Sequence, residues 1–231
     1  MELAPERYIG HIRAEAGTLA CPDWNVYDLV AHTSAVHRWA AEMIRNRATQ
    51  RLSRKDMPAA PVGQAVIDWF EEGVERLLVA LQEAGPDAPV WNWAAEPTAA
   101  FWFRRQAQET AVHRWDTQSA AGSPTGLDSR LALDGIDELF TLWLPDMKAG
   151  DHGPGLGGSL HVHATDGQGE WTLRDRGPSV SVEVGHGKGD AAIRGTASDL
   201  LLFLWGRPVE ESIEIFGNSE IPRRWHRQMR L

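Results

Sequence analysis

Apolar residues in the first part of the chain recur at the three- and four-residue spacing of amphipathic helices, which keep one face toward a core. The pattern predicts long helices over residues 25–48, 61–84, 98–120 and 128–144, and a short helix over residues 4–19. Asn25 with Asp28 three positions later is typical of a helix start, and Gly85-Pro86 is typical of a helix end. Because short loops favour antiparallel neighbours, we expect an antiparallel four-helix bundle.

The hydrophobic pattern changes at residues 149–158 (AGDHGPGLGG), a glycine-rich stretch that we interpret as a linker. After it, apolar and polar residues alternate, as they do in half-buried strands. The pattern predicts strands near residues 160–164, 171–173, 180–184 and 191–194. Residues 196–199, beginning with Thr196, are typical of a helix start, and the apolar part of that helix follows over residues 200–205. A last strand is predicted at 212–216, before a polar tail. The expected fold class is α+β, with a helical bundle over residues 1–148 and a small α+β domain over residues 149–231.

Composition and charge exclude several classes of protein. The chain has 231 residues, of which 42% are hydrophobic, so it can bury a core, and we expect most of its eleven tryptophans to lie there. A net charge of −9 without a lysine- or arginine-rich run argues against nucleic-acid binding. No apolar run is long enough to span a membrane, and the first residues do not resemble a signal peptide. We therefore expect a cytoplasmic protein with no membrane contact.

The strongest chemical signal is the pair Glu109 and His113, which lie four residues apart in a predicted helix. Residues at this spacing share one helix face, so the carboxylate and the imidazole can converge on one ion. His32, in the middle of another predicted helix, is the natural third donor. Three protein ligands with one open position are typical of catalytic zinc. The alternative is a helix-surface ion pair between Arg105 and Glu109.

Three other residues near this group have less direct roles. His37 follows His32 by five residues, about 140° around the helix, so we interpret it as a buried neighbour and not as a ligand of the same ion. Asp116 is a candidate to orient a ligand histidine. Cys21 is the one cysteine of the chain, which excludes an intramolecular disulfide and a cysteine-rich zinc cluster. We interpret Cys21 as a packed residue and not as a nucleophile.

A rival metal site could form in the second domain. His161 and His163 are two residues apart and share one face of a predicted strand. Asp166 is the nearby candidate for a third ligand, and without a better one we interpret the pair as a solvated strand face. The glycines of residues 153–158 precede a strand, so they do not form a dinucleotide-binding turn, and residues 185–189 are interpreted as a hairpin turn.

Several segments resemble the mycothiol-dependent maleylpyruvate isomerase family, which belongs to the DinB-like four-helix metal-binding superfamily. They are residues 21–32 (CPDWNVYDLVAH), 36–39 (VHRW), 109–116 (ETAVHRWD) and, in the C-terminal domain, 200–208 (LLLFLWGRP). The resemblance covers nearly the whole chain and implies that His32, Glu109 and His113 are the metal ligands. Gln108 and Asp23 depart from the family's usual residues without touching a proposed ligand.

The resemblance also implies an activity. It indicates a characteristically actinobacterial enzyme with a divalent metal, zinc by preference, and mycothiol or another low-molecular-weight thiol as cosubstrate. The thiolate would add to the cis double bond of a small carboxylate, and rotation and elimination would give the trans isomer. In a thiol S-transferase the thiol would instead stay attached to an electrophile. The chain itself would supply no nucleophile.

The family's functionally important C-terminal arginine falls on Arg207, which we expect to act in catalysis and in cosubstrate binding. A guanidinium can hold a substrate or thiol carboxylate by two parallel hydrogen bonds. The alternative is that Arg207 caps the C-terminal carbonyls of the helix before it.

Two other functions stay open from the sequence. The chain could be a non-catalytic metal- or ligand-binding module, or a hydrolase in which the metal activates water. The expected partners are a small-molecule substrate and a thiol, and the chain is expected to be a monomer or a homodimer.

Overall fold

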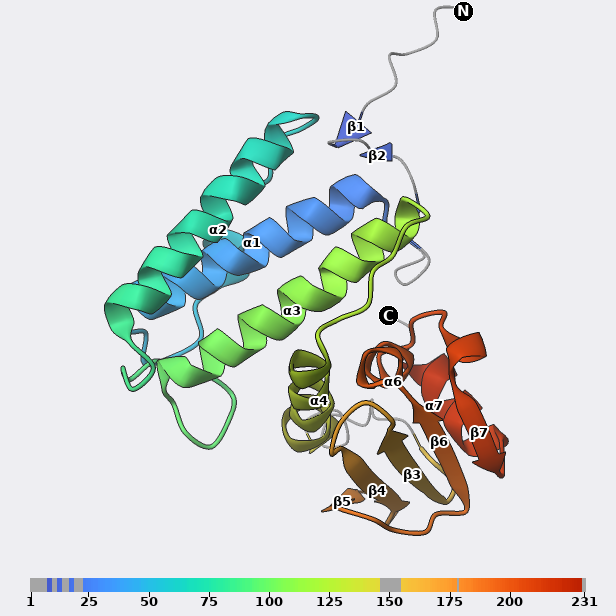
Figure 1. Ribbon diagram of the computed structural model, residues 1–231. Coiled ribbons are helices and arrows are strands. Elements are labelled where there is room, and N and C mark those ends of the chain that lie inside the picture. Colours follow the sequence, from blue (N-terminus) through green and yellow to red (C-terminus); the bar gives the residue numbers. More distant parts are fainter. Residues whose placement is uncertain are drawn as a thin grey trace, which may run out of the picture. The chain divides into compact units, whose positions relative to one another are not determined.

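The computed structural model describes residues 8–9, 12–13, 17–18, 23–145, 155–177 and 179–229. These residues divide into two compact units, the first ending at Thr125 and the second beginning at Gly126. The first unit is mainly helical, and the second is built on a sheet covered by helices (Figure 1). The expected α+β fold class is therefore confirmed. Within the described residues, no helix is both long enough and apolar enough to cross a membrane.

Three long helices form the first unit, α1 (Val26–Arg45), α2 (Ala65–Ala84) and α3 (Ala99–Ala120), with a 3-10 turn η1 (Arg54–Asp56) between the first two. The start of α1 is fixed by a capping box. The Asn25 side chain accepts a hydrogen bond from the Asp28 backbone, and the Asp28 side chain accepts one from the Asn25 backbone. The sequence signal for this helix start is therefore correct.

Helices α1 and α2 run in the same direction, and α3 runs against both (Figure 1). Ser34 donates to the carbonyl of Trp69, and Arg38, one turn later in α1, contacts Glu72, one turn later in α2. The two neighbouring helices are therefore parallel. The expected short loop is absent between them, because residues 46–64 form the connection. Such a segment can reach roughly 60 Å, about twice the length of a 20-residue helix, so it can return to the end where α1 began.

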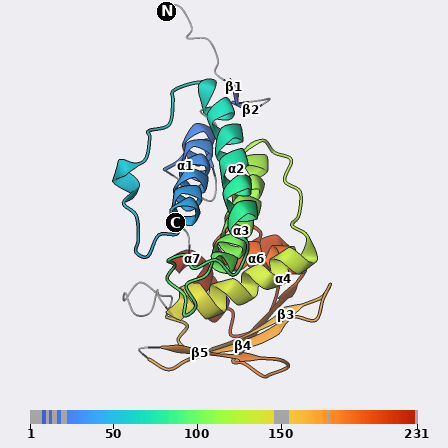
Figure 2. The same ribbon diagram turned by 90° about the vertical axis from the view of Figure 1, so that its left-hand side faces the viewer.

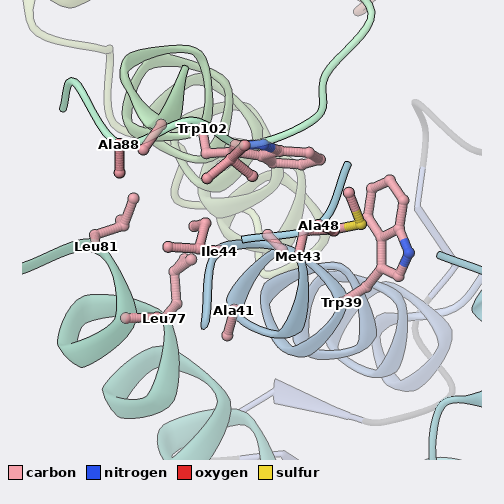
Figure 3. Packing of buried hydrophobic residues seen from close by; sticks show 13 residues of the cluster. Trp39, Ala41, Met43, Ile44, Ala48, Leu77, Leu81, Ala88 and Trp102 are labelled. Atoms are coloured by element: carbon pink, nitrogen blue, oxygen red, sulfur yellow. The ribbon is translucent and has the colours of Figure 1, made fainter. Parts of the chain in front are cut away.

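The main core of the first unit lies where all three helices approach one another (Figure 3). Trp102 on α3 is fully buried, and its ring meets that of Trp39 edge to face at a centroid distance of 5.3 Å. Both indole nitrogens donate to loop carbonyls, Trp102 to Trp91 and Trp39 to Leu52. These tryptophans therefore fill the core, as expected, and also hold the neighbouring loops against it.

A short helix over residues 4–19 was predicted, and this prediction is wrong in its described part. Residues Tyr8–Ile9 (β1) and Ile12–Arg13 (β2) form a small antiparallel pair. Tyr8, Ile9 and Ile12 are aromatic or β-branched residues, which favour strands over a helix.

The second unit holds a five-stranded sheet in the order β5-β4-β3-β6-β7. Its strands are β3 (Ser159–Ala164), β4 (Glu170–Asp175), β5 (Val180–Val184), β6 (Ala191–Gly195) and β7 (Glu214–Gly217). Its helical elements are α4 (Ser129–Glu138) with the π-helical turn η2 (Leu139–Trp143), α6 (Ala197–Leu204), the 3-10 turn η3 (Glu210–Ser212) and α7 (Glu220–Gln228). Neighbouring strands are antiparallel except β3 and β6, which are parallel. The predicted strands are thus confirmed.

The two faces of this sheet differ. Leu160, Val162 and Ile193 are fully buried on one face, and α4, α6 and α7 lie on that side (Figure 2). Residues that alternate with them point to the opposite face, which carries His161 and His163. No helix of the described chain covers that second face in Figure 2.

Three details of the second unit differ from the sequence-based expectation. The units divide before α4 and not at residues 148/149, because α4 packs on α6 and the Leu127 backbone donates to Ser198 Oγ. The expected polar tail contains α7, which buries Ile221 and Trp225. Residues 185–190 are not a hairpin turn, because they join β5 at one edge to β6 on the far side of β3. Residues 146–154, which hold most of the expected linker, lie outside the described residues.

Candidate metal centre

The first unit brings the three predicted metal ligands together. His32 Nε2 on α1 lies 3.3 Å from Glu109 Oε1 on α3. His113 Nε2, one helical turn beyond Glu109, lies 3.3 Å from the same oxygen. The side chains of His32, Glu109 and His113 are 29%, 19% and 11% exposed. One carboxylate oxygen therefore faces two imidazole nitrogens that come from two antiparallel helices.

The donor set fits a divalent transition ion. The donor atoms of His32, Glu109 and His113 lie within 4.8 Å of one another. Zinc bonds of about 2.0–2.2 Å place two tetrahedral ligand atoms roughly 3.3–3.6 Å apart, and both measured nitrogen-to-oxygen distances are 3.3 Å. Trp24, just before α1, lies against His32 with ring centroids 4.7 Å apart and borders the group.

Charged residues behind the group hold its side chains in place. The Asp116 carboxylate, whose side chain is fully buried, lies 3.0 Å from His113 Nδ1, so Nε2 of His113 is left to face Glu109. Arg105 lies 3.4 Å from Oε2, the other oxygen of Glu109. The Arg105–Glu109 ion pair considered from sequence is present, but it is largely buried and uses a different oxygen from the histidines.

The carboxylates of Glu109 and Asp116 favour a positive charge on the neighbouring histidines. Burial alone would raise the pKa of Glu109, but hydrogen bonds to His113 and His32 and the charge of Arg105 outweigh it and hold this pKa well below its usual range. Burial would lower the pKa of His113, but hydrogen bonds to Asp116 and Glu109 outweigh it and raise this pKa. A divalent ion bound between Glu109 and the two histidines would supply this positive charge in place of a proton on a histidine ring.

His37 is a buried neighbour of the group, as expected, and is 1% exposed. Its Nε2 lies 3.0 Å from the Thr110 hydroxyl, which donates to the carbonyl of Gln106 and must therefore accept from His37. Burial lowers the pKa of His37 to about 4, despite the opposing charge of Glu109. The ring is accordingly neutral at neutral pH.

Arg207 lies in the second unit, just after α6, and only 2% of it is exposed. Its guanidinium donates to the carbonyl of Trp205 at 2.8 Å, and its own carbonyl accepts from His226 Nε2 at 2.9 Å. The contact with Trp205, the C-cap of α6, is of the kind expected for the helix-capping alternative. Cys21 lies outside the described residues, so its expected packing stays a prediction.

The sequence missed the acidic partner of the His161/His163 pair. Asp166 accepts a hydrogen bond from the Ala197 backbone at the start of α6, and the carboxylate near both histidines belongs to Glu170. Glu170 is on the neighbouring strand, opposite His163. Strand register decides this contact, and the spacing of residues along one strand carries no signal for it.

Family models match nearly all of the chain. The N-terminal domain of mycothiol maleylpyruvate isomerase matches residues 11–118, and the MDMPI C-terminal domain matches residues 130–220. The chain belongs to the mycothiol-dependent maleylpyruvate isomerase family. The resemblance seen in the sequence is therefore confirmed, and the two matches meet in the region where the compact units of this family member divide.

Two sequence relatives and one solved structure are also similar to this maleylpyruvate isomerase family member. Two uncharacterized proteins of Mycobacterium tuberculosis are each 25% identical to it over 153 residues, which cover 64% of this chain and 75% of theirs. A crystal structure of a mutant of mycothiol-dependent maleylpyruvate isomerase matches with a TM-score of 0.60 and 15% identity, over 90% of this chain and 83% of that chain. This structural likeness shows a shared fold.

Proposed function

We propose that the protein is a metal-dependent enzyme that uses a low-molecular-weight thiol to act on a small carboxylate or electrophile. Mycothiol is the first thiol to test. The reaction is a cis/trans isomerisation or a thiol S-transfer. The observation that carries this proposal is the Glu109 oxygen that lies 3.3 Å from Nε2 of both His32 and His113. Family membership supports the choice of thiol and of substrate class.

His32, Glu109 and His113 would hold the ion, and zinc suits two imidazoles and one carboxylate. When bound, such an ion favours the thiolate form of a thiol that reaches it. Asp116 fixes the ring of His113, and Arg105 holds the second oxygen of Glu109, so the donor atoms of these two residues keep their positions. His32 is the most exposed of the three, with 29% of its side chain open to solvent, so we expect small molecules to approach from its side.

Arg207 belongs to this proposal as the residue that binds a carboxylate of the substrate or the thiol. A chain with a net charge of −9 repels anions, so a local cation is needed for a carboxylate to bind productively. Because Arg207 donates to the Trp205 carbonyl, the carboxylate would replace that contact or share the guanidinium with it.

The test is a turnover assay with tag-free, zinc-loaded protein on a panel of cis-unsaturated diacids and electrophiles, each with and without added mycothiol. We expect turnover that requires the thiol. Glu109→Gln and His113→Ala should remove most of the metal of the helical unit and lower turnover to near the background rate, since both change a proposed ligand.

Glu72→Gln is the matched control, because Glu72 also contacts an arginine in the helical unit, Arg38 at 3.3 Å, but lies outside the proposed ligand group. This variant should keep its metal and its turnover. Turnover without thiol would favour a hydrolase. Full metal binding without turnover of any substrate in the panel would favour a non-catalytic binding module.

A further inference from the structure

The uncovered face of the sheet carries a second group of histidines around a glutamate. His161 and His163 on β3 point to this face, and the register of β3 with β4 places His163 opposite Glu170 and His161 opposite Thr172. Glu170 Oε1 lies 3.3 Å from His163 Nδ1, and Glu170 Oε2 lies 3.2 Å from His161 Nε2. The donor atoms of these three residues lie within 4.8 Å of one another.

A third histidine joins the group from the crossover between β5 and β6, residues Gly185–Asp190. His186 Nδ1 lies 2.8 Å from Glu170 Oε2, and its ring centroid is 5.7 Å from that of His161. Gly187 lets the crossover lie directly on the sheet, because a Cβ at this position would collide with the Thr172 hydroxyl. The backbone thus carries His186 across β4 toward β3.

We propose that His161, His163 and Glu170, with His186 as a fourth donor, form a second binding site for a divalent transition ion of the zinc type. Three imidazole nitrogens and one carboxylate are a donor set that such ions prefer. His161 and His163 lie 3.2 and 3.3 Å from the two oxygens of Glu170, close to the roughly 3.3–3.6 Å expected between tetrahedral zinc ligands. His186, at 2.8 Å from Glu170, would move slightly outward to bind the same ion.

The surroundings of the group support this site. His161 Nδ1 lies 3.0 Å from the Thr172 hydroxyl, which leaves Nε2 of His161 to face Glu170. The side chain of His186 is 87% exposed, so an ion can enter from solvent. A bound ion would also fasten the crossover to the sheet.

The experiment counts zinc per chain by elemental analysis after equilibrium dialysis of the full-length, tag-free protein. The wild type should bind about two ions. His161→Ala/His163→Ala should bind about one, and so should His32→Ala/His113→Ala, while the combination of all four changes should bind close to none. Zinc should also slow amide hydrogen exchange in residues 185–190 of the wild type and of the His32→Ala/His113→Ala variant.

Glu183→Gln is the matched control, because Glu183 lies opposite Thr172 on the same sheet face but contacts Arg174. It should still bind about two ions. The proposal is overturned if the wild type binds about one ion and His161→Ala/His163→Ala still binds it. If zinc is lost with His161→Ala/His163→Ala but unaffected by His32→Ala/His113→Ala, the second site stands and the metal centre of the proposed function fails.

Discussion

The helical unit and the sheet unit each place a glutamate against histidines, but they do so by different means. In the helical unit Glu109 and His113 come from one helix, and a buried carboxylate supports the group from behind. In the sheet unit the glutamate arrives from a neighbouring strand, the supporting group is the Thr172 hydroxyl, and His186 is almost fully exposed. The helical group is therefore supported by a buried carboxylate, and the sheet group lies on a face that no described helix covers, where His161 is buried and His186 is exposed.

Acidification should destabilise the helical unit through His37, which is buried against a neutral hydroxyl. Its pKa is about 4 in the folded protein and about 6.5 in the unfolded chain. The unfolded chain therefore binds more protons between these values, and the free energy of unfolding falls as the pH drops from 6.5 to 4. For this residue the loss is about 3 kcal/mol.

Urea unfolding of the metal-free protein at several pH values measures this loss. His37→Gln should be less stable than the wild type at pH 7 but should lose less stability on acidification. Glu183→Gln in the sheet unit serves as the control and should keep the wild-type pH dependence. Equal pH slopes in the wild type and in His37→Gln would show that His37 is not buried in its neutral form.

The supporting groups behind the two histidine groups should each matter for metal affinity. Asp116→Asn weakens the contact to His113 Nδ1 and should lower zinc affinity in the helical unit by about ten-fold to a hundred-fold. Thr172→Val removes the contact to His161 and should lower zinc affinity in the sheet unit, by about ten-fold. Competition with a chromophoric chelator measures both constants, each in a variant whose other site is disabled. If a variant lowers the melting temperature of the metal-free protein but leaves its zinc affinity unchanged, Asp116 or Thr172 contributes to packing and not to metal binding.

Variants of Arg207 test whether a residue of the sheet unit takes part in the reaction. Arg207→Ala should lower kcat/KM by about ten-fold or more, the value of one charged hydrogen bond, while metal content stays the same. Arg207→Lys should restore part of the rate, because an ammonium group cannot reproduce two parallel hydrogen bonds. Steady-state kinetics and thermal melts decide the question. Wild-type kinetics with a clearly lower melting temperature would assign Arg207 to capping helix α6 through Trp205 and remove it from the active site.

The smallest effect is expected for Cys21→Ser. The proposed nucleophile is an added thiol and the proposed ligands are nitrogen and oxygen atoms, so activity and metal content should both stay near wild-type values. Loss of turnover in a folded, metal-loaded Cys21→Ser protein would make Cys21 the nucleophile.

Local patterns in the sequence predicted most of the long helices and the strands, and they also led to the proposal of His32, Glu109 and His113 as one group. The capping pair of Asn25 and Asp28 marked the start of α1, and the spacing of Glu109 and His113 placed both on one helix face. Alternating residues marked the strands around His161 correctly. Each of these signals depends on neighbours within a few residues, which is why the sequence displays them.

Contacts between distant segments could not be predicted in the same way. The parallel course of α1 and α2 depends on the path of residues 46–64, and the partner of His163 depends on strand register. Helix α7 was missed because most of its residues are polar, although Ile221 and Trp225 are four residues apart and both are buried.

The parallel pairing of β3 with β6 also bears on how the newly made chain folds. Leu160 pairs with Ala191, so one side of this central strand stays without its partner until the ribosome has released the later strand. The contacts within α1 and α3 are local, and such contacts form early. Pulse-labelled hydrogen exchange on stalled chains should therefore show protected amides in the helical unit before β3 is protected. During that interval the uncompleted strand edge presents unpaired backbone groups that can pair with another chain.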